Sequence, residues 1–534
     1  MDADLLLILP LVVPLAAAVL ALLLRNVPRA QAGINLISMS VVLAASLGLL
    51  ATINEQGIQA FASGGWPAPF GIVLVADYLS VIMLIVSAII GVAVAVYAIP
   101  NIDTERVHFG FYPFMNLLML GINGSFLTGD LFNLYVWFEV MLISSFVLIV
   151  LGNTEDQLAG GVKYVMINLV SSLFFLTGAG LIYGLTGTLN MAELSIVLND
   201  TGSPGLVTVI AMMFLVAFGI KAALFPLFFW LPSSYHTPPA AVSAFFAGLL
   251  TKVGVYAMIR VFTLLFTQDI GYTHTTMLIW VAGLTMVTGV LGAAAQNDFR
   301  RVLSFHIVSQ IGYMIMGLAL YTPLALIGAV FYIIHHIIVK ANLFLVSGVA
   351  ERLGGSFSLK KLQGLYAHHP GLAILFLIPA FSLAGFPPLS GFWAKLVLAK
   401  AGIEAGAYGI VAVAIAVGLF TMFSMTKIWV KAFLPGSSDP ADTAPESASE
   451  NGTFKPASMT LGTRLMYVPI AALAGLTIMI SVFAGPVFDL AERSANELSD
   501  SSAYIEAVLG HEEPAADPYT RLDMDRRSGD VHAR

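Results

Sequence analysis

Two lysines stand inside long apolar runs of this sequence. Lys221 is followed five residues later by Pro226, and Lys252 has no acidic residue beside it. A lysine at the centre of a membrane helix costs roughly 2.5–3.5 kcal/mol and marks a functional site by default. The pattern therefore predicts an ion pathway through this part of the chain. The alternative is that both side chains extend along the helix to the membrane surface.

Prolines predict a broken helix beside two of the interior lysines. Pro226 lacks a backbone N–H and clashes with the carbonyl of the residue four positions earlier, so a helix must kink or end there. We expect the freed carbonyls and the negative end of the preceding half-helix to stabilise a cation at Lys221. Pro387 and Pro388 give a second break ahead of Lys395. Because Lys395 lies in the following half-helix, we expect no such help for its charge.

Glu139 is the only charged residue between Asp130 and Glu155. A lone carboxylate in apolar surroundings takes up a proton, whereas an ammonium within about 4–6 Å keeps it ionised. We expect Lys221 to be its partner. Such a pair would hold a proton on the lysine when the carboxylate approaches and release it when the carboxylate withdraws. The alternative is a purely structural ion pair.

Histidines accompany the lysines. In HHIIVKANLF, His336 and Lys340 are four residues apart and share a helical face. A neutral imidazole can both give and take a proton, so it can bridge two lysines. His335 and His306 are weaker relay candidates, and His306 could equally be a hydrogen-bonded core residue. His236, in SSYHTPP, is either a proton uptake group near one membrane surface or an ordinary loop histidine.

The residue types argue against a cofactor in this chain. The sequence contains no cysteine, which excludes thiolate-bound zinc and cysteine-ligated iron–sulfur clusters within it. The adjacent histidines 335 and 336 lack a neighbouring carboxylate or cysteine, so we expect no metal site there. We also expect no other cofactor and no nucleic-acid partner.

The composition is that of a polytopic membrane protein. Of the 534 residues, 58% are hydrophobic and only 10% are charged, against about 25% charged in soluble proteins. A spanning helix needs about 20 mostly apolar residues. On that rule we predict an all-α protein with about fourteen transmembrane helices. They lie near 4–24, 31–53, 72–98, 109–127, 130–151, 160–185, 206–231, 239–265, 275–296, 301–320, 323–350, 371–399, 406–431 and 464–486.

Basic residues in short loops predict the orientation, because such loops stay in the cytoplasm. The loops after odd-numbered spans hold most of these residues: Arg25, Arg29, Arg106, Arg300, Arg301, Arg352, Lys360 and Lys361. We therefore expect both termini and the 187–205 loop outside the cytoplasm, and the 351–370 and 434–463 segments inside.

The broken-helix signals suggest an internal symmetry, since interrupted hydrophobic segments at matching places in two halves point to a transporter site. We predict three N-terminal spans (1–105) and two five-helix repeats (106–268 and 269–433), the second inverted because five is odd. A flexible cytoplasmic linker rich in Pro, Ser and acids (434–463) follows. The last span (464–487) and a polar tail (488–534) complete the chain, and 495–510 could form a short amphipathic helix.

Several motifs resemble a known family. EVMLISS, GIKAALFPLFFWLPSSYHTPPAAVSAFFAGLLTKVGVY, QNDFRRVLSFHIVSQIGYM, HHIIVKANLF and LAGFPPLSGFWAK are similar to the antiporter-like subunits of respiratory complex I, membrane-bound hydrogenases and Mrp-type sodium/proton antiporters. The resemblance implies fourteen helices, inverted five-helix repeats, broken seventh and twelfth helices and a proton path along the membrane midplane. By motif match it implies functional roles for Glu139, Lys221, Lys252, Lys340 and Lys395.

Within this family, the length, the N-terminal run and the linker look most like the D subunits of Mrp antiporters. The expected function is proton translocation in a multisubunit sodium/proton antiporter of a bacterial plasma membrane, with other membrane subunits as partners and protons and sodium as ions. One alternative is a pumping subunit of a complex I-like NADH:quinone oxidoreductase or a hydrogenase. Another is a non-conducting scaffold.

Overall fold

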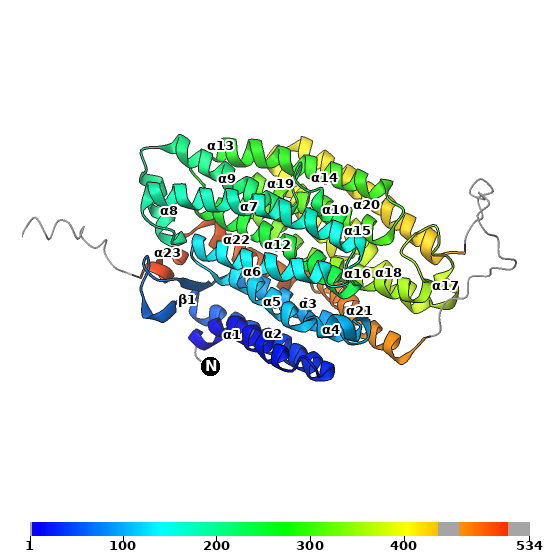
Figure 1. Ribbon diagram of the computed structural model, residues 1–534. Helices are drawn as coiled ribbons and strands as arrows, with labels where there is room; N and C mark the ends of the chain where they lie inside the picture. The colour runs from blue at the N-terminus through cyan, green and yellow to red at the C-terminus, as the bar shows by residue number, and fades with distance from the viewer. Residues whose placement is uncertain (1–2, 436–458, 511–534) are drawn as a thin grey trace, which may run out of the picture.

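The long helices lie side by side in one bundle (Figure 1), in a computed structural model that describes residues 3–435 and 459–510. In these ranges, twelve helices are long and apolar enough to cross a membrane. They are α1 (Ala3–Leu23), α2 (Pro28–Gln56), α3 (Tyr78–Asn101), α6 (Leu131–Val150), α7 (Glu155–Thr186), α9 (Pro204–Ala222), α11–α12 (Ala240–Leu264), α13–α14 (Ile270–Ala295), α15 (Phe299–Leu320), α16 (Pro323–Gly354), α20 with its last turn (Tyr408–Phe433) and α21 (Leu461–Val482). In Figure 1, α1 and α2 form one edge of the bundle and α13 and α14 the opposite edge.

Two further expected spans fall on shorter helices. The 109–127 segment forms α5 (Phe111–Leu127), and the 371–399 segment forms α18 (Pro370–Ala384) and α19 (Ser390–Glu404). Both α5 and α18 are apolar but have fewer residues than the twelve long helices. That they also cross the membrane, giving fourteen spans, stays a prediction. The inverted relation of the two repeats stays one as well.

The loop after α2 contains a short strand pair that was not predicted. Strands β1 (Gln59–Ala62) and β2 (Val73–Ala76) pair antiparallel, with Gln59 opposite Ala76. Gly129 N–H donates to the carbonyl of Val73 at 2.8 Å, so the pair is also tied to the turn before α6. Pairing satisfies backbone groups that a buried loop would leave without partners.

Both proline-containing segments interrupt a helix. The α9 helix ends at Ala222, Ala223 has a left-handed φ of 62°, and α10 (Trp230–Ser234) begins only after Pro226. Likewise, α18 ends at Ala384, Gly385 caps it with a φ of 89°, and α19 starts at Ser390. A left-handed residue after the last turn is a common way for a helix to end.

The centre of the bundle is formed by three spans. The most apolar stretch of α11–α12 is entirely buried, and those of α15 and α16 are nearly so. A helix that is apolar on all sides belongs in such a position. The π-helical turn Phe246–Leu250 separates α11 (Ala240–Phe245) from α12 (Thr251–Leu264). The interior lysines and histidines of the central spans are therefore shielded from lipid.

The C-terminal part packs across the bundle. The α21 helix lies against α3, α16 and α18. The α22 helix (Ala484–Ser499) packs against α16 and α3. The α23 helix (Ser502–Leu509) contacts β1 and α8 (Met191–Asp200). The tail thus forms two helices where one short helix over 495–510 was expected. Most of the predicted linker and the tail beyond residue 510 lie outside the described residues. Two short helices, α4 (Thr104–His108) and α17 (Leu365–His368), lie in connecting segments.

Candidate functional site

Lys221 occupies the last turn of α9, directly before the first break. Its side chain is buried, and its Nζ has no hydrogen-bond partner in the described part of the chain. The ring centroid of Phe138 lies 5.6 Å from Nζ. Glu139, on α6, is near enough to act on Lys221 electrostatically. Its carboxylate, however, accepts a hydrogen bond from Ser172 of α7.

The structure bears on two expectations about Lys221. Within residues 3–435 and 459–510 it forms no direct ion pair with Glu139, although Glu139 lies near enough to act on it, so their pairing stays a prediction. Nor do the carbonyls at the end of α9 hold the ammonium. The Ala223 N–H caps the carbonyls of Gly219 and Ile220, and Trp230 Nε1 also donates to Ile220 at 3.0 Å. The cap does not use the last two carbonyls, those of Lys221 and Ala222, but Lys221 Nζ forms no hydrogen bond to them either.

Gly254 positions the first break against the central helix α12. A Cβ at this glycine would lie 2.7 Å from the backbone nitrogen of Ala222 and 3.0 Å from the carbonyl carbon of Lys221. Only a glycine permits this approach without a shift of the backbone. The segment that holds Lys221 is thereby set beside the helix that holds Lys252.

Four titratable residues meet at the centre of the bundle: Lys252 on α12, His306 on α15, and His336 and Lys340 on α16. All four are fully buried, and His336 is near enough to the other three to sense their charges. Lys252 Nζ donates to the carbonyl of Ala247, in the π-helical turn, at 2.5 Å. Lys340 Nζ lies 3.4 Å from the carbonyl of Leu303 on α15.

Both ring nitrogens of His306 and of His336 are buried without a protein partner in the described residues. The amide oxygen and nitrogen of Asn342, half a turn beyond Lys340, are likewise buried without a protein partner in the described residues. Buried polar groups nearly always have a hydrogen-bond partner, and water supplies it where protein does not. His306 thus has no protein hydrogen-bond partner in the described residues, and the arrangement favours water between these groups.

At the second break, Lys395 forms hydrogen bonds to backbone carbonyls, which Lys221 does not in the described residues. Its Nζ donates to the carbonyls of Leu383 and Ala384 at 3.1 and 3.0 Å. The cap at Gly385 uses the carbonyls of Phe381 and Ser382 and leaves the last two free. The expectation that the charge of Lys395 receives no help from a helix end was therefore wrong.

His335 is connected to the same break. Its Nδ1 lies 2.8 Å from Ser390 Oγ, the first residue of α19, and Ser390 Oγ lies 2.9 Å from Ser382 Oγ. A Cβ on Gly391 would overlap the Ser382 carbonyl and lie 2.8 Å from His335 Nε2. A glycine at this position therefore lets α16, α18 and α19 meet closely.

The sequence analysis missed a polar group between the centre and Lys395. The Tyr332 hydroxyl donates to Gln310 Oε1, and the Tyr332 ring stacks on Tyr313 with centroids 5.2 Å apart. Lys395 Nζ lies 4.9 Å from the Tyr313 ring centroid. A signal was available, because His306, Gln310 and Tyr313 are four and three residues apart and share one face of α15.

His236 lines a cleft at the end of the bundle from which α11 starts. The cleft has a volume of about 450 Å³, and Asp156, Asp298, Arg300 and Arg301 also line it. His236 Nε2 accepts a hydrogen bond from Arg301 Nε at 3.1 Å. Burial first, and then the charges of Arg301 and Arg300, lower the pKa of His236 to about 4. The imidazole is therefore neutral at physiological pH and open to an aqueous cleft.

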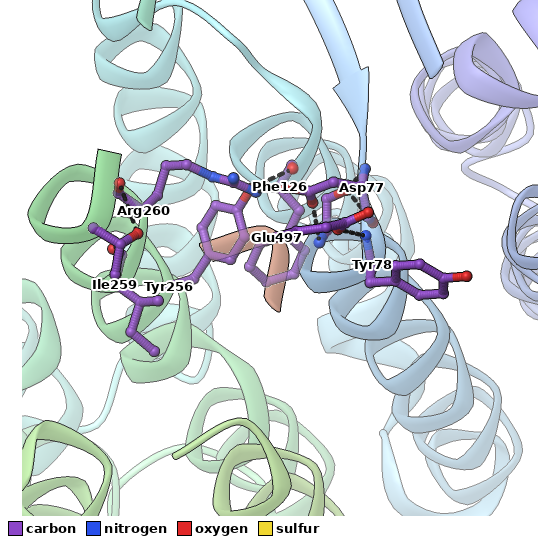
Figure 2. A network of polar contacts seen from close by, with 9 residues as sticks. Asp77, Tyr78, Phe126, Tyr256, Ile259, Arg260 and Glu497 are labelled. Atoms are coloured by element: carbon purple, nitrogen blue, oxygen red, sulfur yellow. Dashed lines mark hydrogen bonds and ion pairs between the residues drawn. The ribbon is translucent and has the colours of Figure 1, made fainter. Parts of the chain in front are cut away.

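A separate polar network lies near the C-terminal end of α12, and Figure 2 shows it from close by. Arg260, near the end of α12, forms a buried ion pair of 2.5 Å with Asp77, the cap of α3. Glu497 of α22 lies beside them and accepts a hydrogen bond from Tyr78 N–H at 2.8 Å. The sequence analysis predicted no functional role for Asp77, Arg260 or Glu497.

The structure thus groups the predicted residues in three places. Lys221 and Glu139 lie at the first break, and Lys252, His306, His336 and Lys340 lie at the centre. His335 and Lys395 lie at the second break, while His236 lies apart in the cleft. In the described residues, no group of three or more His, Cys, Asp or Glu side chains could hold a metal ion.

Known proteins share this sequence and architecture. Residues 128–421 match the family described as NADH:quinone oxidoreductase/Mrp antiporter, TM. The D subunit of the Na(+)/H(+) antiporter of Alkalihalophilus pseudofirmus is 48% identical over 94% of this chain and 99% of its own. A chain of the Mrp complex from Dietzia sp. DQ12-45-1b is 33% identical with a TM-score of 0.86, covering 95% of this chain and 100% of that one.

A chain of the membrane-bound sulfane sulfur reductase, an archaeal respiratory complex, has a TM-score of 0.85 but is only 26% identical, over 94% of this chain and 99% of its own. The fold is therefore common to antiporter and redox complexes, while the sequence lies nearer to the antiporter subunits. By the extent of these matches, this chain belongs to the NADH:quinone oxidoreductase/Mrp antiporter transmembrane family.

Proposed function

We propose that this chain is the proton-translocating subunit of a multisubunit sodium/proton antiporter in a bacterial plasma membrane. The observation that carries the proposal is the central group of Lys252, His306, His336 and Lys340. These side chains are fully buried on the three innermost spans, and the two imidazoles have no protein partner in the described residues. A scaffold does not need two lysines near each other in an apolar centre, because buried charges are costly.

In the proposed mechanism, His236 takes up a proton from the cytoplasmic cleft or returns one to it. Glu139 and Lys221 form the next station. Since Lys221 has no other polar contact in the described residues, a small movement of the Glu139 carboxylate would decide how firmly the proton is held. Proton transfer needs donor and acceptor within hydrogen-bond reach or joined by one water.

From Lys221 the proton passes to Lys252 and then, through His336, to Lys340. A neutral imidazole accepts on one nitrogen and donates from the other, so His336 connects two lysines without adding a permanent charge. His335 and the pair Tyr332–Gln310 lead from there to Lys395 at the second break. Irregular backbone at membrane depth is tolerated where it lines a hydrated cavity, which suits Lys395 as the last group of the relay.

The proposed orientation of the chain in the membrane rests on the basic residues of its loops. The cleft around His236 contains Arg300 and Arg301 and is assigned to the cytoplasmic side, with both termini outside. Antiport is favoured over a redox-driven pump by the higher identity to the D subunit of an antiporter. Mass spectrometry of the intact complex tests this choice, because copurifying subunits with cysteine clusters would indicate a redox pump.

Transport through the central group is tested with Lys252→Gln, with the whole complex expressed in cells that lack their own antiporters. Sodium-dependent proton movement is measured in everted vesicles and divided by the amount of assembled complex. We expect normal assembly and a loss of about two orders of magnitude, the usual contribution of a positioned proton-transfer group. Near wild-type antiport per complex would refute the relay.

The matched control is Lys427→Gln. Lys427 Nζ donates to the carbonyls of Ala293, Ala294 and Gln296 at the end of α14. It is not a member of the central group, and of that group only His306 is near enough to sense its charge in the described residues. We expect this variant to lower the amount of complex while antiport per assembled complex stays unchanged. If Lys252→Gln behaves in the same way, the scaffold alternative is correct.

A further inference from the structure

The polar network of Asp77, Arg260 and Glu497, called the outer network below, joins three distant parts of the chain at the end of α12. Asp77 Oδ1 accepts the Ser80 N–H at 2.9 Å as the cap of α3, and its Oδ2 pairs with Arg260. Arg260 Nη2 also lies 3.4 Å from the hydroxyl of Tyr256. Asp77 and Arg260 therefore already neutralise each other. A second carboxylate beside them has no unpaired cation as its partner.

Glu497 is that second carboxylate. Its side chain is half-buried, so one part contacts the network and another part is exposed at the surface of the chain. Arg493, one turn earlier on the same helix, does not neutralise it, because Arg493 Nη1 donates to Asn54 and to the Tyr78 hydroxyl at 2.9 Å. The titratable and charged groups around Glu497 are Asp77 and Tyr78 of α3, Arg260 and Tyr256 of α12, Tyr504 of α23 and Arg493 of α22.

Two carboxylates share one guanidinium here, so the network has one negative charge in excess when both are ionised. Burial first, and then the neighbouring Asp77 carboxylate, raise the pKa of Glu497 from the ordinary 4.5 to about 8, against the Tyr78 N–H and Arg260, which lower it. The uncharged carboxyl is the form that this site favours at neutral pH. An ordinary exposed glutamate, by contrast, has released its proton there.

The position of the network relates it to the relay. Arg260 and Lys252 lie on the same helix, eight residues apart, which corresponds to about 12 Å along the axis. Tyr256 lies halfway between them, four residues from each, on the same face. The network occupies the end of the α11–α12 span opposite the His236 cleft, which is the outer end in the proposed orientation.

We propose that Glu497 is a proton-binding site at the outer end of the bundle, where protons are exchanged between the external water and the relay. The proton comes from the water outside, rests on the Glu497 carboxylate and leaves along the α12 face toward Lys252, or moves in the reverse direction. This route joins the relay at Lys252, in its middle, and gives it a second connection besides the one at its Lys395 end. The C-terminal helices α22 and α23 thus hold an exchange group in place. This inference rests on the proposed function, since a proton site needs a relay to serve.

Glu497→Gln separates proton binding from packing. Glutamine keeps the size of the side chain and an oxygen for the Tyr78 N–H but does not titrate. If Glu497 only holds α22 in place, this variant is neutral or slightly stabilising, because it removes the excess charge. If Glu497 exchanges protons, antiport per assembled complex falls about tenfold or more, while Glu497→Asp keeps part of the activity with an altered dependence on external pH.

Glu492→Gln is the matched control, because Glu492 is an exposed carboxylate on the same helix. We expect it to leave antiport and its pH profile unchanged. Infrared titration of the purified complex gives a readout that does not depend on transport. The wild type should lose a protonated carboxyl signal as the pH rises through about 8, and Glu497→Gln should lack that signal.

Wild-type antiport in Glu497→Gln, or an unchanged carboxyl signal in that variant, would overturn the inference. The inference and the proposed function fail separately. If Glu497→Gln is fully active while Lys252→Gln is inactive, the relay stands and its outer exchange group lies elsewhere. If Lys252→Gln is also fully active, the proposed function itself fails.

Discussion

Lys395 Nζ donates a hydrogen bond of 3.0 Å to the carbonyl of Ala384, the last residue of the half-helix before it. The equivalent lysine at the first break has no such contact in the described residues. Two breaks that look alike in sequence therefore treat their lysines differently. The charge of Lys395 is stabilised by a helix end, whereas that of Lys221 depends on the nearby Glu139.

Glu139→Ala should abolish antiport although the complex still assembles. Among the described residues, the carboxylate is the one charge that acts favourably on Lys221. Its loss therefore leaves a buried ammonium without compensation, and the lysine gives up its proton. Antiport in everted vesicles, divided by complex abundance, measures the effect. Because the two groups are not in contact, the loss of stability should stay below the roughly 3–5 kcal/mol typical of a broken buried pair.

Ser172→Ala is the control for this prediction. It removes the hydroxyl that donates to Glu139 but leaves both charges in place, so antiport should be reduced and not lost. Wild-type antiport in an assembled Glu139→Ala complex would contradict the role of the pair.

Lys395→Arg should be nearly as harmful to transport as Lys395→Ala. Arginine keeps the charge and can still donate to the carbonyls of Leu383 and Ala384, but it stays protonated in proteins and so does not pass its proton on. The alanine variant should in addition be less stable by about 1–3 kcal/mol, since it leaves buried carbonyls without a donor. Antiport and thermal stability are measured for both. An active arginine variant beside a poorly assembled alanine variant would show that Lys395 is structural.

Lys360→Cys should react with a membrane-impermeant thiol reagent only from the cytoplasmic side. The chain has no cysteine of its own, so a single introduced thiol reports its own location. Asn199→Cys, in the 187–205 segment, should react only from outside. Labelling of position 360 in intact cells would reverse the proposed orientation, and with it the assignment of the His236 cleft to the cytoplasm.

His236 should make the complex sensitive to acid. Its pKa of about 4 in the folded chain lies below the ordinary 6.5, so the unfolded chain binds a proton at a higher pH than the folded one. The folded state therefore has its full stability above about pH 6.5 and loses part of it as the pH falls toward 4, because only the unfolded chain binds the proton in this range. Melting temperatures of the complex across this range should fall less steeply in His236→Gln.

The exposed His108 on α4 supplies the comparison for that measurement. His108→Gln should leave the acid sensitivity of the wild type unchanged. Equal slopes for the wild type and His236→Gln would mean that His236 does not contribute to it.

The sequence by itself determined where the membrane helices run and where two of them end. Apolar runs of sufficient length and the backbone chemistry of proline are local properties, so they could be read one segment at a time. The same locality revealed the interior charges Glu139, Lys221, Lys252, Lys340 and Lys395. A charge in an apolar run is conspicuous whatever surrounds it.

Only the tertiary structure decided which groups these charges meet. Ala223 and Gly385 cap their helices in the same way, through the carbonyls four and three residues earlier, so the caps do not distinguish the two breaks. Lys395 reaches the last two carbonyls from the following half-helix, whereas Lys221 belongs to the last turn itself. The outer network was out of reach of sequence reasoning, because Tyr78 and Glu497 are 419 residues apart. Contacts at that separation follow from the packing of α22 against α3, which no single segment encodes.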